Sequence, residues 1–208
     1  MSASTALVEF RTATMDDAER IAGLLTDAFL DGPLAVWLVG WERERRAVLH
    51  GYLALQVERA VQFGTVYVTA DLSAVACWLP HAAGRACPPP SYPVRLMGVC
   101  DGWADRFFTL EDSFAAHHLP VPHQHLTHLA VAPDQDLQTV GGKLLDHCHT
   151  SFDETGVVTY VEAVNPENRK LYEAHGYQAS DPIQLPELGP HWWPMTRTPN
   201  PNPGDGQS

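Results

Sequence analysis

The segment 126–145, LTHLAVAPDQDLQTVGGKLL, contains the residues best suited to holding an anion. Leu126–Val131 is predicted as a buried strand, Pro133–Val140 as a loop, and Gly141–Thr155 as a helix that begins at a pair of glycines. Such a loop directs unpaired backbone N–H groups toward the helix start, where the helix dipole adds partial positive charge. The pattern is compatible with a phosphate site, and equally with an ordinary strand–loop–helix connection.

A carboxylate lies within another predicted strand, Val157–Val164. This residue, Glu162, shares a strand face with Tyr160. A charged side chain on a central strand usually has a partner or a function, because burying it alone is costly. Glu162 is therefore a candidate general base, acting through a water molecule. Structural pairing with an arginine is an equally compatible interpretation.

The eleven histidines raise the question of a metal site, since several lie close together in the chain. Their spacings include no HExxH or comparable arrangement of ligands, and the four cysteines form no CxxC pair. We therefore predict no metal centre and reduced, buried thiols. The histidines considered are His117, His118, His123, His125 and His128.

Three side chains are candidates for contacting a substrate. His128 lies on the predicted strand Leu126–Val131 and could face an acceptor site. Trp192 and Trp193 could line an aromatic pocket, although core packing of one of them is the simpler interpretation.

Strands and helices alternate along the chain, which favours α/β or α+β architecture with a mixed sheet. Thr14 is the predicted cap of the first helix, Asp31-Gly32-Pro33 ends it, and Pro166 begins the last helix. Pro194 is expected to place the final strand at a sheet edge or a bulge. The predicted strands are 7–14, 65–69, 72–80, 126–131, 157–164 and 191–197, and the later helices are 42–62, 141–155 and 166–176.

The length of 208 residues and the hydrophobic content of 45% fit one domain with a sizeable core. We predict this domain over residues 1–198, with an insertion at about 80–124 and a disordered tail over 199–208.

The net charge of −12 argues against nonspecific nucleic-acid binding, which needs clustered basic residues. No apolar run approaches the roughly 20 residues of a membrane span, and the first residues do not have the pattern of a secretory signal. We expect a cytoplasmic protein without a membrane partner.

The run VAPDQDLQTVGGKLL resembles the acyl-CoA-binding motif of the GNAT superfamily of N-acetyltransferases. That motif is Gln/Arg-x-x-Gly-x-Gly/Ala, between a strand ending in Val-x-Pro and a helix containing Leu-Leu. It falls here on residues 136–141. A second family element is similar to NPENRKLYEAHGY at 165–177, and the closing HWWPMTR resembles the puromycin N-acetyltransferase-like branch, whose members modify antibiotics. The resemblance covers about residues 7–79 and 125–198.

The resemblance implies a single GNAT-like domain with a mixed, mostly antiparallel central sheet flanked by helices. It implies direct transfer of an acetyl or related acyl group from acetyl-CoA to the amine of a small molecule, such as an antibiotic or specialised metabolite. Tyr172 would be the acid that protonates the leaving thiolate, with helix packing as its alternative, and Glu162 would be the base. The implied donor-binding residues are Leu129, Ala130, Val131, Asp136, Leu137, Gln138, Thr139, Val140, Gly141, Gly142 and Asn168.

Two motif positions depart from the family pattern. Asp136 replaces the usual Gln or Arg, and Thr139 replaces the first glycine. A carboxylate facing a diphosphate at 4–6 Å would cost on the order of 1–3 kcal/mol. The cradle for pyrophosphate is therefore expected to be weakened, while the pantetheine-binding strand is intact.

This weakening leaves two alternatives to acetyl-CoA chemistry. The donor could be a phosphopantetheine thioester on an acyl carrier protein, docked on the basic cluster of Arg43, Arg45 and Arg46. The domain could also be a catalytically silent binding module, against which Tyr172 and Glu162 argue.

Overall fold

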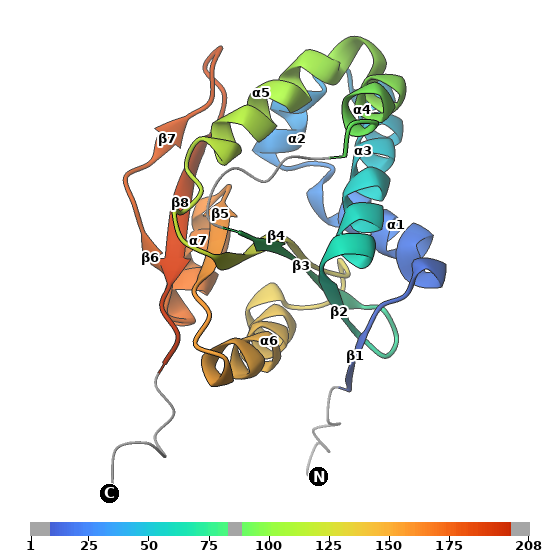
Figure 1. Ribbon diagram of the computed structural model, residues 1–208. Helices are drawn as coiled ribbons and strands as arrows, with labels where there is room; N and C mark the ends of the chain where they lie inside the picture. The colour runs from blue at the N-terminus through green and yellow to red at the C-terminus, as the bar shows by residue number, and fades with distance from the viewer. Residues whose placement is uncertain (1–8, 83–88, 201–208) are drawn as a thin grey trace, which may run out of the picture.

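The computed structural model describes residues 9–82 and 89–200. One sheet runs in the order β1-β2-β3-β4-β5-β8-β6, and β7 pairs with β8 (Figure 1). The paired strands are antiparallel except for β4 and β5, which confirms the predicted mixed sheet. The strands are β1 (Phe10–Thr12), β2 (Thr65–Thr69), β3 (Ala74–His81), β4 (His123–Val131), β5 (Thr159–Ala163), β6 (Gln178–Ala179), β7 (Ile183–Gln184) and β8 (His191–Arg197).

Helices cover both faces of the sheet (Figure 1). Alternation along β3 separates two cores, because Val75 and Cys77 join the core under α1 and α3 whereas Ala76 and Trp78 join the core under α6 and α7. The helices are α1 (Ala18–Phe29), α2 (Pro33–Leu38), α3 (Glu42–Phe63), α4 (Tyr92–Cys100), α5 (Ala104–Ala115), α6 (Gly142–Glu154) and α7 (Pro166–Ala174).

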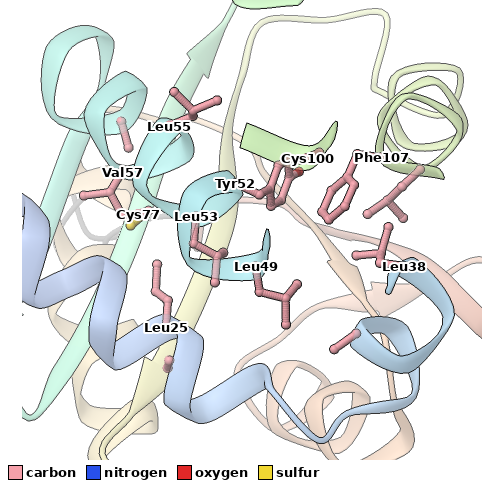
Figure 2. Packing of buried hydrophobic residues seen from close by; sticks show 14 of the residues in the cluster. Leu25, Leu38, Leu49, Tyr52, Leu53, Leu55, Val57, Cys77, Cys100 and Phe107 are labelled. Carbon is pink, nitrogen blue, oxygen red and sulfur yellow. The ribbon is translucent and has the colours of Figure 1, made fainter. Parts of the chain in front are cut away.

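The helices of the predicted insertion are part of the larger core. Figure 2 shows Leu49 and Leu53 of α3 between Leu25 of α1 and the ring of Phe107 from α5. The Phe107 ring is fully buried and lies 4.6 Å from the Tyr52 ring, centroid to centroid. Burying such a side chain contributes roughly 1.5–3 kcal/mol. The α4–α5 segment is therefore held firmly over α3, where it can form a wall of a site.

The start of the first helix agrees with the capping residue predicted from the sequence. Thr14 precedes a short 3-10 turn, and its backbone N–H donates to the Asp17 carboxylate at 2.9 Å, which forms a capping box before α1. The strand predicted at 7–14 is shorter, since β1 spans Phe10–Thr12 and residues 7–8 lie outside the described part. Most of the tail predicted at 199–208 also lies outside the described residues.

The expectation for the last strand was wrong in one respect. β8 is an interior strand, with β5 on one side and β6 and β7 on the other. Pro194 lies opposite Glu162 in the register with β5, and its carbonyl accepts a hydrogen bond from the Ser180 N–H at 2.8 Å. Proline is tolerated here because its carbonyl, rather than an N–H, makes the bond toward Ser180.

The two parallel strands diverge soon after they meet. β4 pairs with β5 only over Gln124–Leu126, while it pairs with β3 along its whole length. An irregularity at Thr127, whose hydroxyl donates to the Cys77 carbonyl at 3.1 Å, interrupts the β3–β4 register at the same level. The edge of residues 127–131 that faces away from β3 therefore has no strand partner within residues 9–82 and 89–200.

Candidate functional site

A cavity of about 620 Å³ lies at the divergence of β4 and β5. Its wall includes the open strand segment Leu129–Val131, the carboxylate residue Glu162 of β5, and Tyr172 of α7. Residues of α1, α3 and α5 close the other side. The cavity therefore joins the predicted donor strand to both predicted catalytic residues, from three separate elements.

The open strand segment offers backbone groups to an extended ligand. Leu129, Ala130 and Val131 all line the cavity, and the next residue, Ala132, is tied back to the Ser73 carbonyl at 2.7 Å. An extended amide chain placed beside this segment would complete the strand ladder with N–H and C=O groups.

Glu162 is buried, with 8% of its surface exposed, and its partner is a histidine rather than the arginine considered from sequence. His125 Nε2 lies 2.6 Å from Glu162 Oε2. Burial raises the pKa of Glu162 to about 7, with the neighbouring His118 acting in the opposite direction. A carboxyl group with this pKa can accept a proton near neutral pH, as a general base requires.

His118 and His125 lie beside this carboxylate, and His81 packs on both of their rings. His81 of β3 stacks on His118 with ring centroids 4.2 Å apart, and His125 meets both rings edge-on. Burial lowers the pKa of each of these three rings to about 3. The side chains around Glu162 therefore supply hydrogen-bonding nitrogen atoms without adding positive charge.

Tyr172 lies on the cavity wall opposite the donor strand segment and is 3% exposed. Burial, with a smaller contribution from the charge of Glu162, raises the pKa of its phenol above the ordinary value. The hydroxyl therefore keeps its proton at neutral pH and can donate a hydrogen bond to a sulfur atom on which negative charge develops.

The motif loop differs from a simple anion cradle, as the departures at Asp136 and Thr139 suggested. Asp136 caps the turn Leu137–Gly141, and its Oδ2 accepts hydrogen bonds from the backbone N–H of Thr139 at 2.9 Å and from the Thr139 hydroxyl at 2.6 Å. These bonds lower the pKa of the exposed Asp136 carboxyl, so it is charged. The chain's own carboxylate thus occupies an N–H group that a phosphate could otherwise bind.

The remaining donor-binding candidates are distributed around this turn. Leu137 and Asn168 line the cavity, whereas Gln138, Val140 and the two glycines lie beyond its wall. Space is tight at both glycines: a Cβ on Gly141 would lie 2.9 Å from Leu137 Cδ1, and one on Gly142 would lie 3.1 Å from the His175 ring. The glycines therefore permit close packing of the turn on its surroundings.

The three candidates for substrate contact fall in different places. His128 lines the cavity. Trp192 is 1% exposed and packs on Phe114, and Trp193 packs in the second core beneath the Arg169 guanidinium. Neither tryptophan lines this cavity, and Trp192 has the core position that the sequence analysis gave as the simpler interpretation.

The basic cluster proposed as a docking site is engaged within the chain. Arg45 is buried and donates to the Val39 carbonyl at 2.9 Å. Arg46 pairs with Asp27 at 2.6 Å, and Arg43 lies over the Trp41 ring. Arg43 and Arg46 stay largely exposed, but each has an acidic partner, Glu44 and Asp27 respectively.

Sequence reasoning missed a polar group at the far end of the cavity. Glu111 of α5 accepts hydrogen bonds from the Tyr92 hydroxyl and from Gln56 Nε2, the latter at 3.1 Å. Burial raises the pKa of this carboxyl. No motif marks these residues, since each comes from a different helix, and helix periodicity would assign them to packing.

No protein-family model matches the chain. Among solved structures, one from Corynebacterium glutamicum described as "histone acetyltransferase HPA2 and related acetyltransferase" has a TM-score of 0.72 and 21% identity, covering 94% of this chain and 98% of that one. The polyamine N-acetyltransferase of Drosophila melanogaster, which forms N-acetylagmatine, has a TM-score of 0.66 and 15% identity over 92% and 99%. Arylalkylamine N-acetyltransferase 2 of Aedes aegypti has a TM-score of 0.62 and 13% identity over 93% and 100%.

These similarities extend over nearly the whole of each chain. The protein therefore has the fold of the GNAT N-acetyltransferases, as its motifs predicted. None of the helices in the described ranges is both long and apolar enough to cross a membrane.

Proposed function

We propose that this protein transfers an acetyl group from acetyl-CoA to the primary amine of a small molecule, within a domain that spans residues 1–198. The observation that carries the proposal is the single cavity shared by the open strand segment, Glu162 and Tyr172. Structures of similar fold are described as acting on agmatine and arylalkylamines, which supports a small amine as acceptor. Within this class an antibiotic or other specialised metabolite stays a prediction.

The geometry supplies each requirement of direct transfer. The segment Leu129–Val131 would hold the pantetheine arm and orient the thioester carbonyl. Glu162 would take a proton from the acceptor ammonium, whose freed nitrogen lone pair attacks the carbonyl carbon. As the C–S bond breaks, Tyr172 would protonate the sulfur. The nitrogen then loses a second proton, which restores the Tyr172 hydroxyl, and the proton held by Glu162 is released to solvent. The products are the N-acetylated amine, free CoA and one released proton.

Donor binding provides the primary test. Acetyl-CoA at one hundred times its Kd should stabilise the folded protein by about 2.7 kcal/mol. We expect a clear rise in the melting temperature with acetyl-CoA, and acetylation of at least one amine in a panel of polyamines, arylalkylamines and aminoglycosides detected by release of free thiol. A protein that shows neither stabilisation nor thiol release would exclude the proposed activity.

A donor carried on an acyl carrier protein is a second candidate, favoured by one observation. The Asp136 carboxylate occupies the Thr139 N–H, which weakens the site for a diphosphate but leaves the pantetheine strand open. Turnover with acetylated carrier protein, without stabilisation or turnover by acetyl-CoA, would establish this alternative.

Asp136→Asn is predicted to improve acetyl-CoA binding. Asparagine keeps a cap on the turn but removes the negative charge beside the expected diphosphate position. We expect the Kd for acetyl-CoA to fall about tenfold, corresponding to roughly 1.4 kcal/mol, as measured by calorimetry. Affinity for S-acetylpantetheine, which carries no phosphate, serves as the control and should be unchanged. Equal changes for both donors would place Asp136 outside the diphosphate site.

A further inference from the structure

A chain of hydrogen bonds fixes where the protons lie on the buried His123 and the half-buried His118. His123 Nδ1 is 2.8 Å from the Val121 carbonyl, which can only accept, so this nitrogen carries a proton. The other nitrogen of a neutral His123 ring, Nε2, is then an acceptor, and it lies 3.0 Å from His118 Nδ1. His118 must therefore donate from Nδ1, and its Nε2 carries a free lone pair.

This lone pair faces a second acceptor. His118 Nε2 lies 4.0 Å from Glu162 Oε1, too far for a direct hydrogen bond. Oε1 is buried and has no hydrogen-bond partner among the described residues, because His125 binds the other oxygen, Oε2. The Tyr160 hydroxyl lies near this carboxyl group but makes no regular hydrogen bond. The buried Glu162 Oε1, which has no partner among the described residues, and the lone pair of the half-buried His118 Nε2 thus lie next to each other on the cavity wall.

A metal ion fits this position poorly. Ligand atoms of His81, His118 and His125 lie within 4.8 Å of one another. The His81 and His118 rings, however, are stacked with only 12° between their planes. Imidazole lone pairs lie in the ring plane, so two stacked rings cannot direct both lone pairs at one ion without turning one ring away. A group with several N–H donors satisfies the site as it is arranged.

We propose that His118 Nε2 and Glu162 Oε1 form the binding site for the ammonium group of the acceptor, with His123 as the residue that holds His118 in this tautomer. The assignment rests on the proposed function, and it names the group that positions the acceptor. A primary ammonium carries three N–H donors, of which two reach His118 Nε2 and Glu162 Oε1. Glu162 then takes the proton of its own N–H bond, and the nitrogen keeps the electron pair with which it attacks the thioester.

The same geometry assigns a role to the α5–β4 connection. His118 lies near the end of the segment predicted as an insertion. It precedes His123, the first residue of β4, by five residues in the chain. The connection therefore brings to the carboxylate an acceptor that no strand of the sheet supplies. His118 contacts the substrate in this scheme, whereas His123 is a positioning residue.

Two substitutions at His118 separate the roles of its two ring nitrogen atoms. In His118→Asn the amide can replace Nδ1 toward His123 but leaves nothing at the Nε2 position, whereas the longer amide of His118→Gln can place an oxygen there. With agmatine and 2-phenylethylamine as probe amines, we expect His118→Asn to raise KM for the amine roughly 10- to 100-fold. The Kd for acetyl-CoA should be unchanged, and His118→Gln should recover a large part of the loss. His117→Asn is the matched control and should behave as the unmodified protein.

The tautomer is tested separately, without turnover. In protein labelled with ¹⁵N-histidine, long-range ¹H–¹⁵N spectra should show His118 with a protonated Nδ1 and an unprotonated Nε2, assigned by comparison with His118→Gln. An inverted tautomer, or equal amine KM values for His118→Asn and His117→Asn, would overturn the proposal. If no amine is acetylated, the proposed function fails, while the spectra still decide whether the two-acceptor site exists.

Discussion

Glu162→Gln should lower kcat/KM for the amine by about 10²–10⁴-fold, the usual contribution of a general base. Glutamine preserves the size of the side chain and its contact with His125, but it cannot accept a proton. The measurement is steady-state turnover with the best amine of the panel. Glu167→Gln, on the exposed side of α7, is the matched control and should retain full activity.

The pH dependence identifies the carboxyl group responsible. Because the pKa of Glu162 is about 7, activity of the unmodified protein should fall about tenfold per unit as the pH drops below 7, where the base becomes protonated. This acid limb should disappear in Glu162→Gln. Among the groups near Glu162, His118 and His125 stay neutral above pH 5 because their pKa values are about 3. An unchanged acid limb in the variant would assign the titration elsewhere.

Loss of the carboxylate should also affect stability. The pKa of Glu162 is raised in the folded state, so the folded protein binds more protons than the unfolded chain between about pH 4.5 and 7. Stability therefore falls as the pH rises through this range. Glu162→Gln should remove that loss and melt at a higher temperature than the unmodified protein at pH 8. Lower activity combined with higher stability separates a functional carboxylate from a structural one.

Tyr172→Phe is expected to reduce kcat by about 10²–10³-fold, because the thiolate would leave without a proton donor. The ring fills the same space, so the Kd for acetyl-CoA should remain unchanged. Tyr177→Phe is a demanding control: Tyr177 is equally buried at 3%, but its hydroxyl contacts His149 at 3.1 Å, and Tyr177 does not line the cavity. That variant should lose stability rather than turnover.

The result for a better leaving group adds a second criterion. If Tyr172 protonates the sulfur, a donor thioester with a more acidic thiol should be less affected by Tyr172→Phe than acetyl-CoA is, because its thiolate leaves without help. Equal loss with both donors would assign Tyr172 to packing.

Local signals in the sequence predicted the elements that bear the site. The helix predicted at 42–62 was found at Glu42–Phe63, because Gly64 is required where a Cβ would lie 2.0 Å from the Trp78 carbonyl oxygen. The strand, turn and helix of the donor motif were likewise predicted, since hydrophobic runs and glycines there reflect local backbone constraints. The fold was therefore accessible from sequence.

The surroundings of Glu162 were not accessible in the same way. His81 comes from β3 and His118 from the α5–β4 connection, and only the β3–β4 pairing brings them together. The spacing of these histidines along the chain therefore does not predict that their side chains lie together. The same holds for Glu111, which meets Tyr92 and Gln56 through helix packing. The edge position predicted from Pro194 was wrong because residue type alone favours a sheet edge, whereas β6 and β7 pair with this strand.

The short pairing of β4 with β5 has a consequence for the choice of acyl donor. The backbone N–H and C=O groups on the open edge of residues 127–131 can be hydrogen-bonded by a narrow, extended ligand that carries amide groups. Leaving such backbone groups unpaired in a closed site costs about 1–3 kcal/mol each. Acetyl phosphate and simple alkyl thioesters, although chemically competent to acylate amines, would leave this edge unmatched. We therefore expect the proposed transferase to react slowly with small acyl donors and faster with donors that carry a pantetheine arm. This preference would keep the acceptor amine from being acylated by other reactive compounds in the cavity.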